Sequence, residues 1–248
     1  MVNLTGIIIA KNAENIIADC LDSIAFCEEI ILIDNDSSDR TGEIAEKMKA
    51  RVFKVNISNF AQLRNEGMKR ARGKWILYVD SDERIDEKLK ENILSTVTQK
   101  RGEYTAYLIR RKNFYLGKHE WPKIEKILRL FRKDKLRGWS GELHETANIE
   151  GSTGELEGFI NHYTHQSLSS MVDKTNQWSD IEAELRLRAH HPAMKQWRFF
   201  RVMFSAFYDS YVRQKGYKAG TAGLIESIYQ AFSMFITYAK LWEKQQTK

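Results

Sequence analysis

Cysteine, long apolar runs and an export signal are scarce or missing in this chain of 248 residues. Only two cysteines occur, Cys20 in a helical pattern and Cys27 soon after it, which excludes a disulfide framework and a cysteine-based metal site. No stretch reaches the roughly 18 uninterrupted apolar residues of a membrane-spanning helix. Residues 1–10 lack a positively charged region before their apolar run, so we expect no signal peptide. Together these absences predict a soluble, cytoplasmic protein.

The net charge and several missing motifs narrow the possible function classes. The formal net charge is +6, which favours an anionic partner. The chain has no helix-turn-helix, zinc-finger or RNP-like pattern, however, so we do not expect nucleic acid to be that partner. A nucleotidyltransferase would also use carboxylates on an α/β sheet, but its Gly-rich phosphate loop is missing, because Lys11-Asn12-Ala13-Glu14 follows the first predicted strand. That class is kept as an alternative.

The first half of the chain alternates apolar runs with helical patterns. Residues 4–10 form a short apolar run, residues 14–25 carry apolar side chains at helical spacing, and residues 29–33 are apolar again. Further strands are predicted at residues 51–55 and 75–79, with helical patterns between them. Repeated βα units with short polar connections predict an α/β fold with a mostly parallel, Rossmann-like sheet.

Acidic residues follow two of these predicted strands. Asp34 and Asp36 come after the strand at 29–33, and Asp80 and Asp82 come directly after residue 79. An isolated Asp-x-Asp is more often a helix cap, but the carboxyl ends of parallel strands share one edge, so we expect the two clusters to meet there. Neighbouring carboxylates resist joint ionisation unless a cation neutralises them, and their oxygen atoms suit Mg²⁺ or Mn²⁺. The pattern favours a nucleotide-diphosphate site.

Three segments resemble, in order and spacing, the amino-terminal half of the family 2 glycosyltransferases, which have the GT-A fold. They are IIIAKNAENI, ILIDNDSSDRTGEI and LRNEGMKRARGKWILYVDSDERI, and the resemblance covers residues 3–115. The later segments GWSGELHE and FINHYTH are similar to small bacterial β-1,4-glucosyltransferases of the lipopolysaccharide inner core. The resemblance implies metal-dependent, inverting transfer of glucose from UDP-glucose onto an inner-core heptose. Other UDP-hexoses as donor, and another polysaccharide or a peptide as acceptor, stay open.

The resemblance also implies which residues bind the donor. Asp34 matches the residue that holds uracil and ribose, and Asn35 replaces a second acid of the family, so it would accept the uracil N–H without charge assistance. Arg64 matches a basic residue that reaches the uracil or the diphosphate, and Arg129 is expected to point off a strand. The full expected nucleotide-sugar-binding set is Ala10, Asn12, Glu14, Asp34, Asn35, Asp36, Arg64, Asp80, Ser81, Arg129 and His144.

Metal ligands and a general base follow from the same resemblance. Asp82 matches the direct metal ligand, and Asp80 matches a residue on the ribose or on the metal through water. His162 either completes the metal shell or is a hydrogen-bonded structural residue. Glu145 matches the carboxylate that takes the proton of the acceptor hydroxyl, and Glu142 is its alternative.

The last third of the chain is helical throughout. We expect a catalytic domain at residues 1–165, with a nucleotide-sugar half at 1–115 and an acceptor-side half at 116–165, and a helical extension at 166–248. Aromatic residues recur there at three- and four-residue steps among arginines and lysines. They are Trp197, Phe200, Phe204, Phe207 and Tyr211.

Two interpretations of these helices stay open. They pack on the catalytic domain or on another subunit of a homo-oligomer, or they lie in the headgroup layer at the inner face of the cytoplasmic membrane. A third function class is a non-catalytic sugar-nucleotide-binding protein that works through its helical tail. The intact set of Asp80, Asp82 and Glu145 argues against that class.

Overall fold

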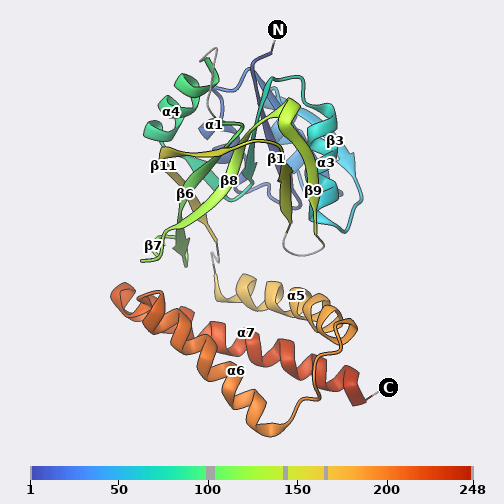
Figure 1. The fold of residues 1–248 in the computed structure, drawn as a ribbon, viewed down its shortest axis with the longest axis vertical. Helices are drawn as coiled ribbons and strands as arrows, with labels where there is room; N and C mark the ends of the chain where they lie inside the picture. The colour runs from blue at the N-terminus through green and yellow to red at the C-terminus, as the bar shows by residue number, and fades with distance from the viewer. Residues whose placement is uncertain (1, 99–103, 142–144, 165–166, 247–248) are drawn as a thin grey trace. The chain divides into compact units, whose positions relative to one another are not determined.

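The structure is a computed structural model that describes residues 2–98, 104–141, 145–164 and 167–246. It divides the chain into two compact units. The first comprises Met1–Lys112 and Glu125–His162, and the second comprises Asn113–Ile124 and Tyr163–Lys248 (Figure 1).

The first unit alternates strands and helices and then continues with strands. Its elements are β1 (Leu4–Ala10), α1 (Ile17–Ser23), β2 (Glu29–Asn35), α2 (Thr41–Lys47), β3 (Arg51–Val55), α3 (Phe60–Arg70), β4 (Trp75–Asp80), β5 (Glu83–Ile85), α4 (Glu87–Thr98), β6 (Ala106–Tyr115), β8 (Glu125–Arg132), β9 (Leu136–Ser140), β10 (Thr146–Ile149) and β11 (Thr153–Tyr163). The main sheet has the strand order β3-β2-β1-β4-β8-β6-β11-β5, and β9 pairs with β10 in a separate two-stranded sheet. The predicted α/β architecture is confirmed.

Strand register brings the two acidic strand ends together. Strands β3, β2, β1 and β4 run parallel, whereas β8 pairs antiparallel with both β4 and β6. Along β1, Ala10 lies opposite Asp34 of β2, and Ile9 lies opposite Asp80 of β4. Both acidic residues therefore flank the carboxyl end of β1, as the βα pattern predicts.

Apolar side chains cover both faces of this sheet. Ile8 of β1 belongs to a core cluster with residues of α1 and α4, whereas its neighbour Ile7 belongs to a cluster on α3. Both side chains are fully buried, as expected when successive residues of a strand point to opposite faces. Gly67 lets α3 lie close to the sheet, because a Cβ atom there would be 2.5 Å from Cγ2 of Ile7. This close packing sets the position of Arg64, one turn earlier on α3.

The helix predicted at residues 14–25 is shorter in the structure, where α1 begins at Ile17. The backbone N–H of Ala13 donates to Oγ1 of Thr41 (2.7 Å), and the N–H of Glu14 donates to Oδ2 of Asp39 (3.0 Å). Side chains of the loop after β2 thus satisfy these donors, so this segment joins that loop rather than extending the helix.

The second unit consists of helices with a short hairpin. Helix α7 (Gly220–Gln246) packs against α5 (Leu168–Arg188) and against α6 (Gln196–Tyr208), which continues as a π turn over Asp209–Arg213. A 3₁₀ turn covers Gly216–Ala219. In the part of the chain that the structure describes, no helix is long and apolar enough to cross a membrane.

Residues 113–124 belong to this helical unit, whereas the sequence analysis assigned them to the catalytic domain. Here β7 (His119–Glu120) pairs with the end of β6, and Trp121 follows. The Trp121 ring packs so closely on Gly216 that a Cβ atom there would be 2.7 Å from it. Its Nε1 donates to Oε1 of Gln214 (3.0 Å). Packing of one tryptophan, which no local pattern reveals, ties the hairpin to the helices.

Candidate active site

Two arginines hold the carboxylate of Asp80 at the end of β4. Nη2 of Arg64 donates to its Oδ1 (3.1 Å), and Nη2 of Arg129 donates to its Oδ2. Arg129 also donates to Oε1 of Glu83 (2.8 Å), and Oε2 of Glu83 accepts the backbone N–H of Asp80 (3.0 Å). Glu83 is fully buried and Arg129 is 5% exposed. The end of β4 is therefore fixed by charged groups inside the fold.

These contacts shift pKa values in opposite directions. Burial alone would raise the pKa of Asp80, but the guanidinium groups of Arg129 and Arg64 outweigh it and hold the pKa well below its usual range. Burial alone would lower the pKa of Arg129, but Asp80 and Glu83 raise it further than burial lowers it. Asp80 and Arg129 are therefore both charged throughout the neutral range.

Glu83 and Arg111 were not among the predicted site residues. Nη1 of Arg111 donates to Oε1 of Glu83 (3.1 Å), and its Nε donates to Oε2 of Glu125 (3.1 Å). Burial alone would lower the pKa of Arg111, but Glu83 and Glu125 raise it. One sequence signal for Glu83 was its place directly after the Asp-x-Asp pair. A carboxylate that becomes buried needs a partner of opposite charge, so a basic residue was to be expected beside it.

Asp82, two residues after Asp80, faces a histidine. Its Oδ2 is 3.2 Å from Nε2 of His162, which β11 brings opposite Glu83 of β5. A carboxylate oxygen and an imidazole nitrogen at this distance fit a divalent cation that takes its other ligands from a substrate. Asp80 is neutralised by arginines instead. Within the described residues, no three His, Cys, Asp or Glu side chains converge as a complete metal site.

Arg64 contacts both the carboxylate at the end of β4 and the predicted general base, Glu145. Its Nε donates to Oε1 of Glu145 (2.9 Å), while its Nη2 bonds Asp80. The guanidinium carbon lies 4.9 Å from the ring centroid of Trp139, and the hydroxyl of Tyr78 donates to the Arg64 carbonyl (3.0 Å). The structure thus brings the predicted residues Arg64, Asp80 and Glu145 together.

The hairpin formed by β9 and β10 is anchored on α3 by polar side chains, and Asn59 at the N-cap donates from Nδ2 to the carbonyl of Gly141 (3.3 Å). Asn65 donates from Nδ2 to the carbonyl of Trp139 (3.0 Å) and accepts the N–H of Trp139 at Oδ1 (2.8 Å). Glu145 directly precedes β10, which pairs with β9. Its position therefore depends on α3 as well as on the β9–β10 pairing.

A cavity of about 500 Å³ opens among these side chains. Asp80, Arg64, Arg129 and Glu145 line it together with the aromatic ring of Trp139. Its remaining lining residues are Leu108, Arg111, Lys126, Ile127, Leu128, Thr146 and Ala147. A lining that combines charged and apolar groups suits a ligand that carries both phosphates and a sugar.

Asp34 has one carboxylate oxygen engaged and one not. Oδ1 accepts the N–H of Ser37 (3.0 Å), whereas the buried Oδ2 has no hydrogen-bond partner among the described residues. Asn35 differs, because its side chain makes two hydrogen bonds with Ile57, to the carbonyl (3.0 Å) and from the N–H (2.9 Å). Oδ2 of Asp34 is therefore unengaged among the described residues, whereas the side chain of Asn35 is already engaged.

Other residues that were predicted to bind the nucleotide sugar lie in the turns around this edge of the sheet. Asn12, at a positive φ of 51°, accepts the N–H of Ser38 (2.9 Å), and Glu14 accepts from Arg40. Asp36 also has a positive φ, of 58°. Three further contacts are those of Asp36 with Asn56, of the Ser81 carbonyl with Arg84, and of Ala10 with Asp34 across the sheet.

Two predicted residues, Glu142 and His144, lie outside the described residues.

Comparison with known proteins decides the family. Residues 5–148, more than half of the chain, match Glycosyl transferase family 2. The chain belongs to this family. The enzyme is therefore a glycosyltransferase, and the resemblance of its three sequence segments is confirmed.

The relatives of this glycosyltransferase match it over nearly its full length. The lipopolysaccharide core biosynthesis glycosyltransferase LpsC of Rhizobium meliloti is 24% identical over 99% of this chain and 94% of its own. An uncharacterized glycosyltransferase of Rickettsia typhi is 25% identical over 98% of this chain and 88% of its own. The crystal structure of Staphylococcus aureus TarS 1-349 aligns with a TM-score of 0.50 and 15% identity, over 99% of this chain and 91% of that one. The glycosyltransferase thus shares the GT-A-like fold of TarS.

Proposed function

We propose that this glycosyltransferase transfers glucose from UDP-glucose onto a heptose of the lipopolysaccharide inner core, with inversion of the anomeric centre. One observation carries the proposal: the guanidinium of Arg64 contacts both Glu145 and Asp80 in a cavity at the carboxyl edge of the sheet. A proton acceptor and the donor-side carboxylate thereby share one ligand-sized space.

Donor binding is assigned to the ends of β2 and β4. We assign Oδ2 of Asp34 as the acceptor for the uracil N–H, because a carboxylate oxygen accepts hydrogen bonds and this one has no partner among the described residues. Arg64, Arg111 and Arg129 add positive charge around the cavity, which favours a diphosphate. TarS, which shares the fold, has been crystallised with UDP and with UDP-GlcNAc, in line with a UDP-sugar donor.

The reaction we assign is a single displacement. Glu145 accepts the proton of the acceptor hydroxyl while the oxygen of that hydroxyl forms a bond to the anomeric carbon. The bond from that carbon to the diphosphate breaks, and the electron pair leaves with UDP. Arg64 keeps the carboxylate of Glu145 in place through its Nε (2.9 Å), so the base is oriented before the acceptor arrives.

Asp82 and His162 would hold the Mg²⁺ or Mn²⁺ ion, because they supply an oxygen and a nitrogen that lie 3.2 Å apart. When bound, such an ion stabilises negative charge on the departing diphosphate. Asp80 is assigned to the ribose instead of to direct ligation, since both of its oxygens accept from arginines.

The acceptor assignment is supported by the likeness to LpsC, whose name places it in lipopolysaccharide core biosynthesis. Such an acceptor is anchored in a membrane, whereas a UDP-sugar is dissolved in water. The proposed location is therefore cytoplasmic, with peripheral contact at the inner face of the cytoplasmic membrane.

A donor and acceptor panel tests the proposal. The wild-type enzyme is incubated with labelled UDP-glucose, UDP-galactose and UDP-N-acetylhexosamines, with a heptose-terminated inner-core oligosaccharide, and with Mg²⁺, Mn²⁺ or a chelator. We expect glucose transfer that stops with chelator and returns with metal, and a product of inverted anomeric configuration by NMR.

Each alternative gives a different result in the same panel. Preference for another UDP-sugar, or transfer only to another polysaccharide or a peptide, would replace the proposed substrates while keeping the reaction. Formation of a nucleotide-sugar bond with release of pyrophosphate would indicate a nucleotidyltransferase. Tight UDP-sugar binding without turnover on any acceptor would indicate a non-catalytic binding protein.

A further inference from the structure

Helix α6 exposes a row of aromatic side chains. Trp197, Phe200, Phe204 and Tyr208 follow one another at steps of three, four and four residues, so they share one side of the helix. Phe200 is 75% exposed and Phe204 is 71% exposed, which is unusual for phenylalanine on a folded surface. The two residues at the end of the predicted row, Phe207 and Tyr211, are partly buried and stack on each other.

Helix α7 extends this apolar surface beside α6. Ile228 is 55% exposed and Phe232 is 39% exposed, and both line a hollow of about 360 Å³ that Phe204 lines from α6. We call the surface formed by Trp197, Phe200, Phe204, Tyr208, Ile228 and Phe232 the α6–α7 face. A second hollow, of about 850 Å³, lies beside it between the two helices.

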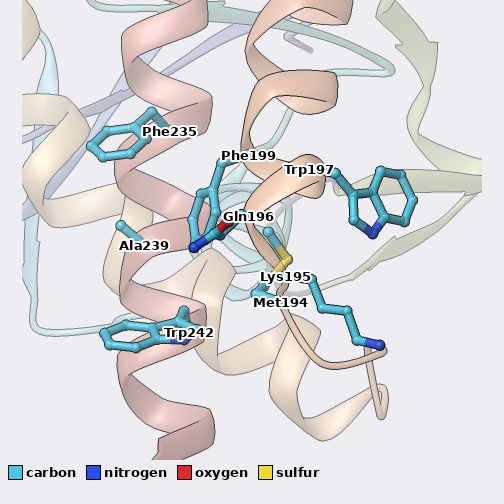
Figure 2. A pocket seen from close by; sticks show the side chains of 8 residues that line it. All are labelled: Met194, Lys195, Gln196, Trp197, Phe199, Phe235, Ala239 and Trp242. Carbon is cyan, nitrogen blue, oxygen red and sulfur yellow. The ribbon is translucent and has the colours of Figure 1, made fainter.

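Figure 2 shows how the second hollow is arranged. Phe199 of α6 projects toward α7, which contributes Phe235 and Trp242, whereas Trp197 projects away from α7. The inner aromatic residues thus hold α6 on α7, and Trp197 presents its ring to the surroundings. The exposed row is additional to the contacts that the helices need for their own packing.

Within the described ranges, the basic residues at the start of α6 make no ion pair with an acidic residue. Between Lys195 and Tyr208 the sequence contains Lys195, Arg198 and Arg201 but neither Asp nor Glu. Arg198 and Arg201 lie over the ring of Trp197, at 5.0 and 5.5 Å from its centroid. None of the three makes an ion pair with a residue in the described ranges.

Basic residues of the neighbouring helices behave differently. On α5, Arg186 pairs with Glu182 (2.8 Å) and Arg188 with Glu184 (3.1 Å). On α7, Lys240 pairs with Asp180 (2.9 Å). Several basic residues of these helices are thus paired within the unit, whereas those beside the aromatic row make no ion pair with a described residue and are available to an external anion.

We propose that the α6–α7 face docks on the surface of an anionic phospholipid bilayer, with its aromatic side chains in the headgroup layer and Lys195, Arg198 and Arg201 at the lipid phosphates. Trp and Tyr at the two ends of the row suit the polar boundary of a membrane, and the two phenylalanines between them suit its apolar side. A second copy of this chain fits less well, because two such faces would bring unpaired cations of the same sign together.

Cosedimentation of the full-length protein with vesicles tests the proposal. The vesicles contain phosphatidylcholine alone or with phosphatidylglycerol, at low and at high salt. We expect wild-type protein to bind the anionic vesicles, to bind neutral ones roughly tenfold less, and to lose affinity as salt rises. Bromine-labelled anionic lipid should quench the tryptophan fluorescence of the wild-type protein more than that of the Trp197→Phe variant.

Two double variants and two matched controls locate the surface. Phe200→Ser with Phe204→Ser, and Arg198→Gln with Arg201→Gln, should each lower vesicle binding about tenfold or more. The apolar control, Val172→Ser with Ile181→Ser, changes exposed residues of α5. The charge control, Lys47→Gln with Lys174→Gln, removes two exposed lysines elsewhere. Both controls should bind like the wild type, and all variants should keep the wild-type circular dichroism spectrum.

Three results would overturn the docking proposal. Wild-type protein could stay in the supernatant with anionic vesicles at low salt, or the controls could weaken binding as much as the α6–α7 variants. Analytical ultracentrifugation without vesicles could instead show a dimer that Phe200→Ser with Phe204→Ser dissociates, which would make this face a subunit interface. Vesicle binding is measured without substrates, so its outcome is independent of the proposed glucose transfer.

Discussion

The sheet edge of the first unit and the α6–α7 face of the second treat charge in opposite ways. At the edge, Arg64, Arg111 and Arg129 each contact carboxylates, and Glu83 holds two of the arginines while fully buried. On α6, Arg198 and Arg201 make no ion pair with a described residue. Buried charges must be neutralised within the fold, whereas exposed charges are neutralised by whatever they meet.

This difference separates two kinds of function. An edge whose side chains are already held in place is organised before its ligand arrives, which is what catalysis by positioning and electrostatics requires. The exposed rings and basic side chains of the α6–α7 face are stabilised only when the face contacts a partner. Substitutions at the edge should therefore change turnover or stability, whereas those on the face should change neither stability nor turnover on a soluble acceptor.

The largest effect is expected at the proposed base. Glu145→Gln keeps the hydrogen bond from Arg64 and removes the proton acceptor, so transfer should fall by about 10²–10⁴ while donor binding survives. Single-turnover transfer and UDP-glucose binding, measured on the same preparation, check this. If Glu142→Gln abolishes transfer and Glu145→Gln leaves it intact, the base is Glu142.

The next effect concerns stability. Glu83→Gln would leave the positive charges of Arg129 and Arg111 without their buried counter-charge, which should lower the free energy of unfolding by about 3–5 kcal/mol. Arg201→Gln on the exposed side of α6 should change it by no more than about 0.5 kcal/mol. Urea unfolding of both variants measures the contrast. Equal losses would show that the α6 charge is structural.

How much of this edge follows from sequence depends on the distance between partners along the chain. Strands β1 and β3 occupy the predicted residues, and Asp34 and Asp80 flank β1 because parallel βα units leave few alternatives. The contact between Arg129 and Glu83 was not predictable in this way. It joins residues 46 positions apart on β8 and β5, which are not neighbours in the sheet, and apolar alternation does not specify which carboxylate an arginine meets.

The proposed metal ligand comes next in size. Asp82→Asn keeps an oxygen near His162 but removes its charge, so transfer should fall roughly 100-fold or more while the thermal midpoint barely changes. Activity is measured across a Mn²⁺ titration. Full activity of this variant in the presence of a chelator would rule out the assigned metal site.

The smallest effect is the pH dependence of stability. The lowered pKa of Asp80 means that its stabilising contribution is complete above the unfolded value of about 3.9 and disappears as pH falls through the folded value. Asp80→Asn should therefore be less stable than the wild type by about 1–3 kcal/mol near pH 7, with the gap closing only in strong acid. Urea unfolding at a series of pH values checks this, and a gap that closes between pH 5 and 7 would contradict it.

Asn65 has a consequence for altering this enzyme. The side-chain amide of Asn65 donates one hydrogen bond to the carbonyl of Trp139 and accepts one from its N–H. A residue on a neighbouring strand would make the same two bonds to β9. This contact holds β9 one residue before its end, close to residues 141–145, which connect β9 to β10. If Glu145 is the base as we propose, exchange of residues 141–144 among homologues, with Asn65 and Trp139 kept, should change the acceptor preference and leave donor binding as it is.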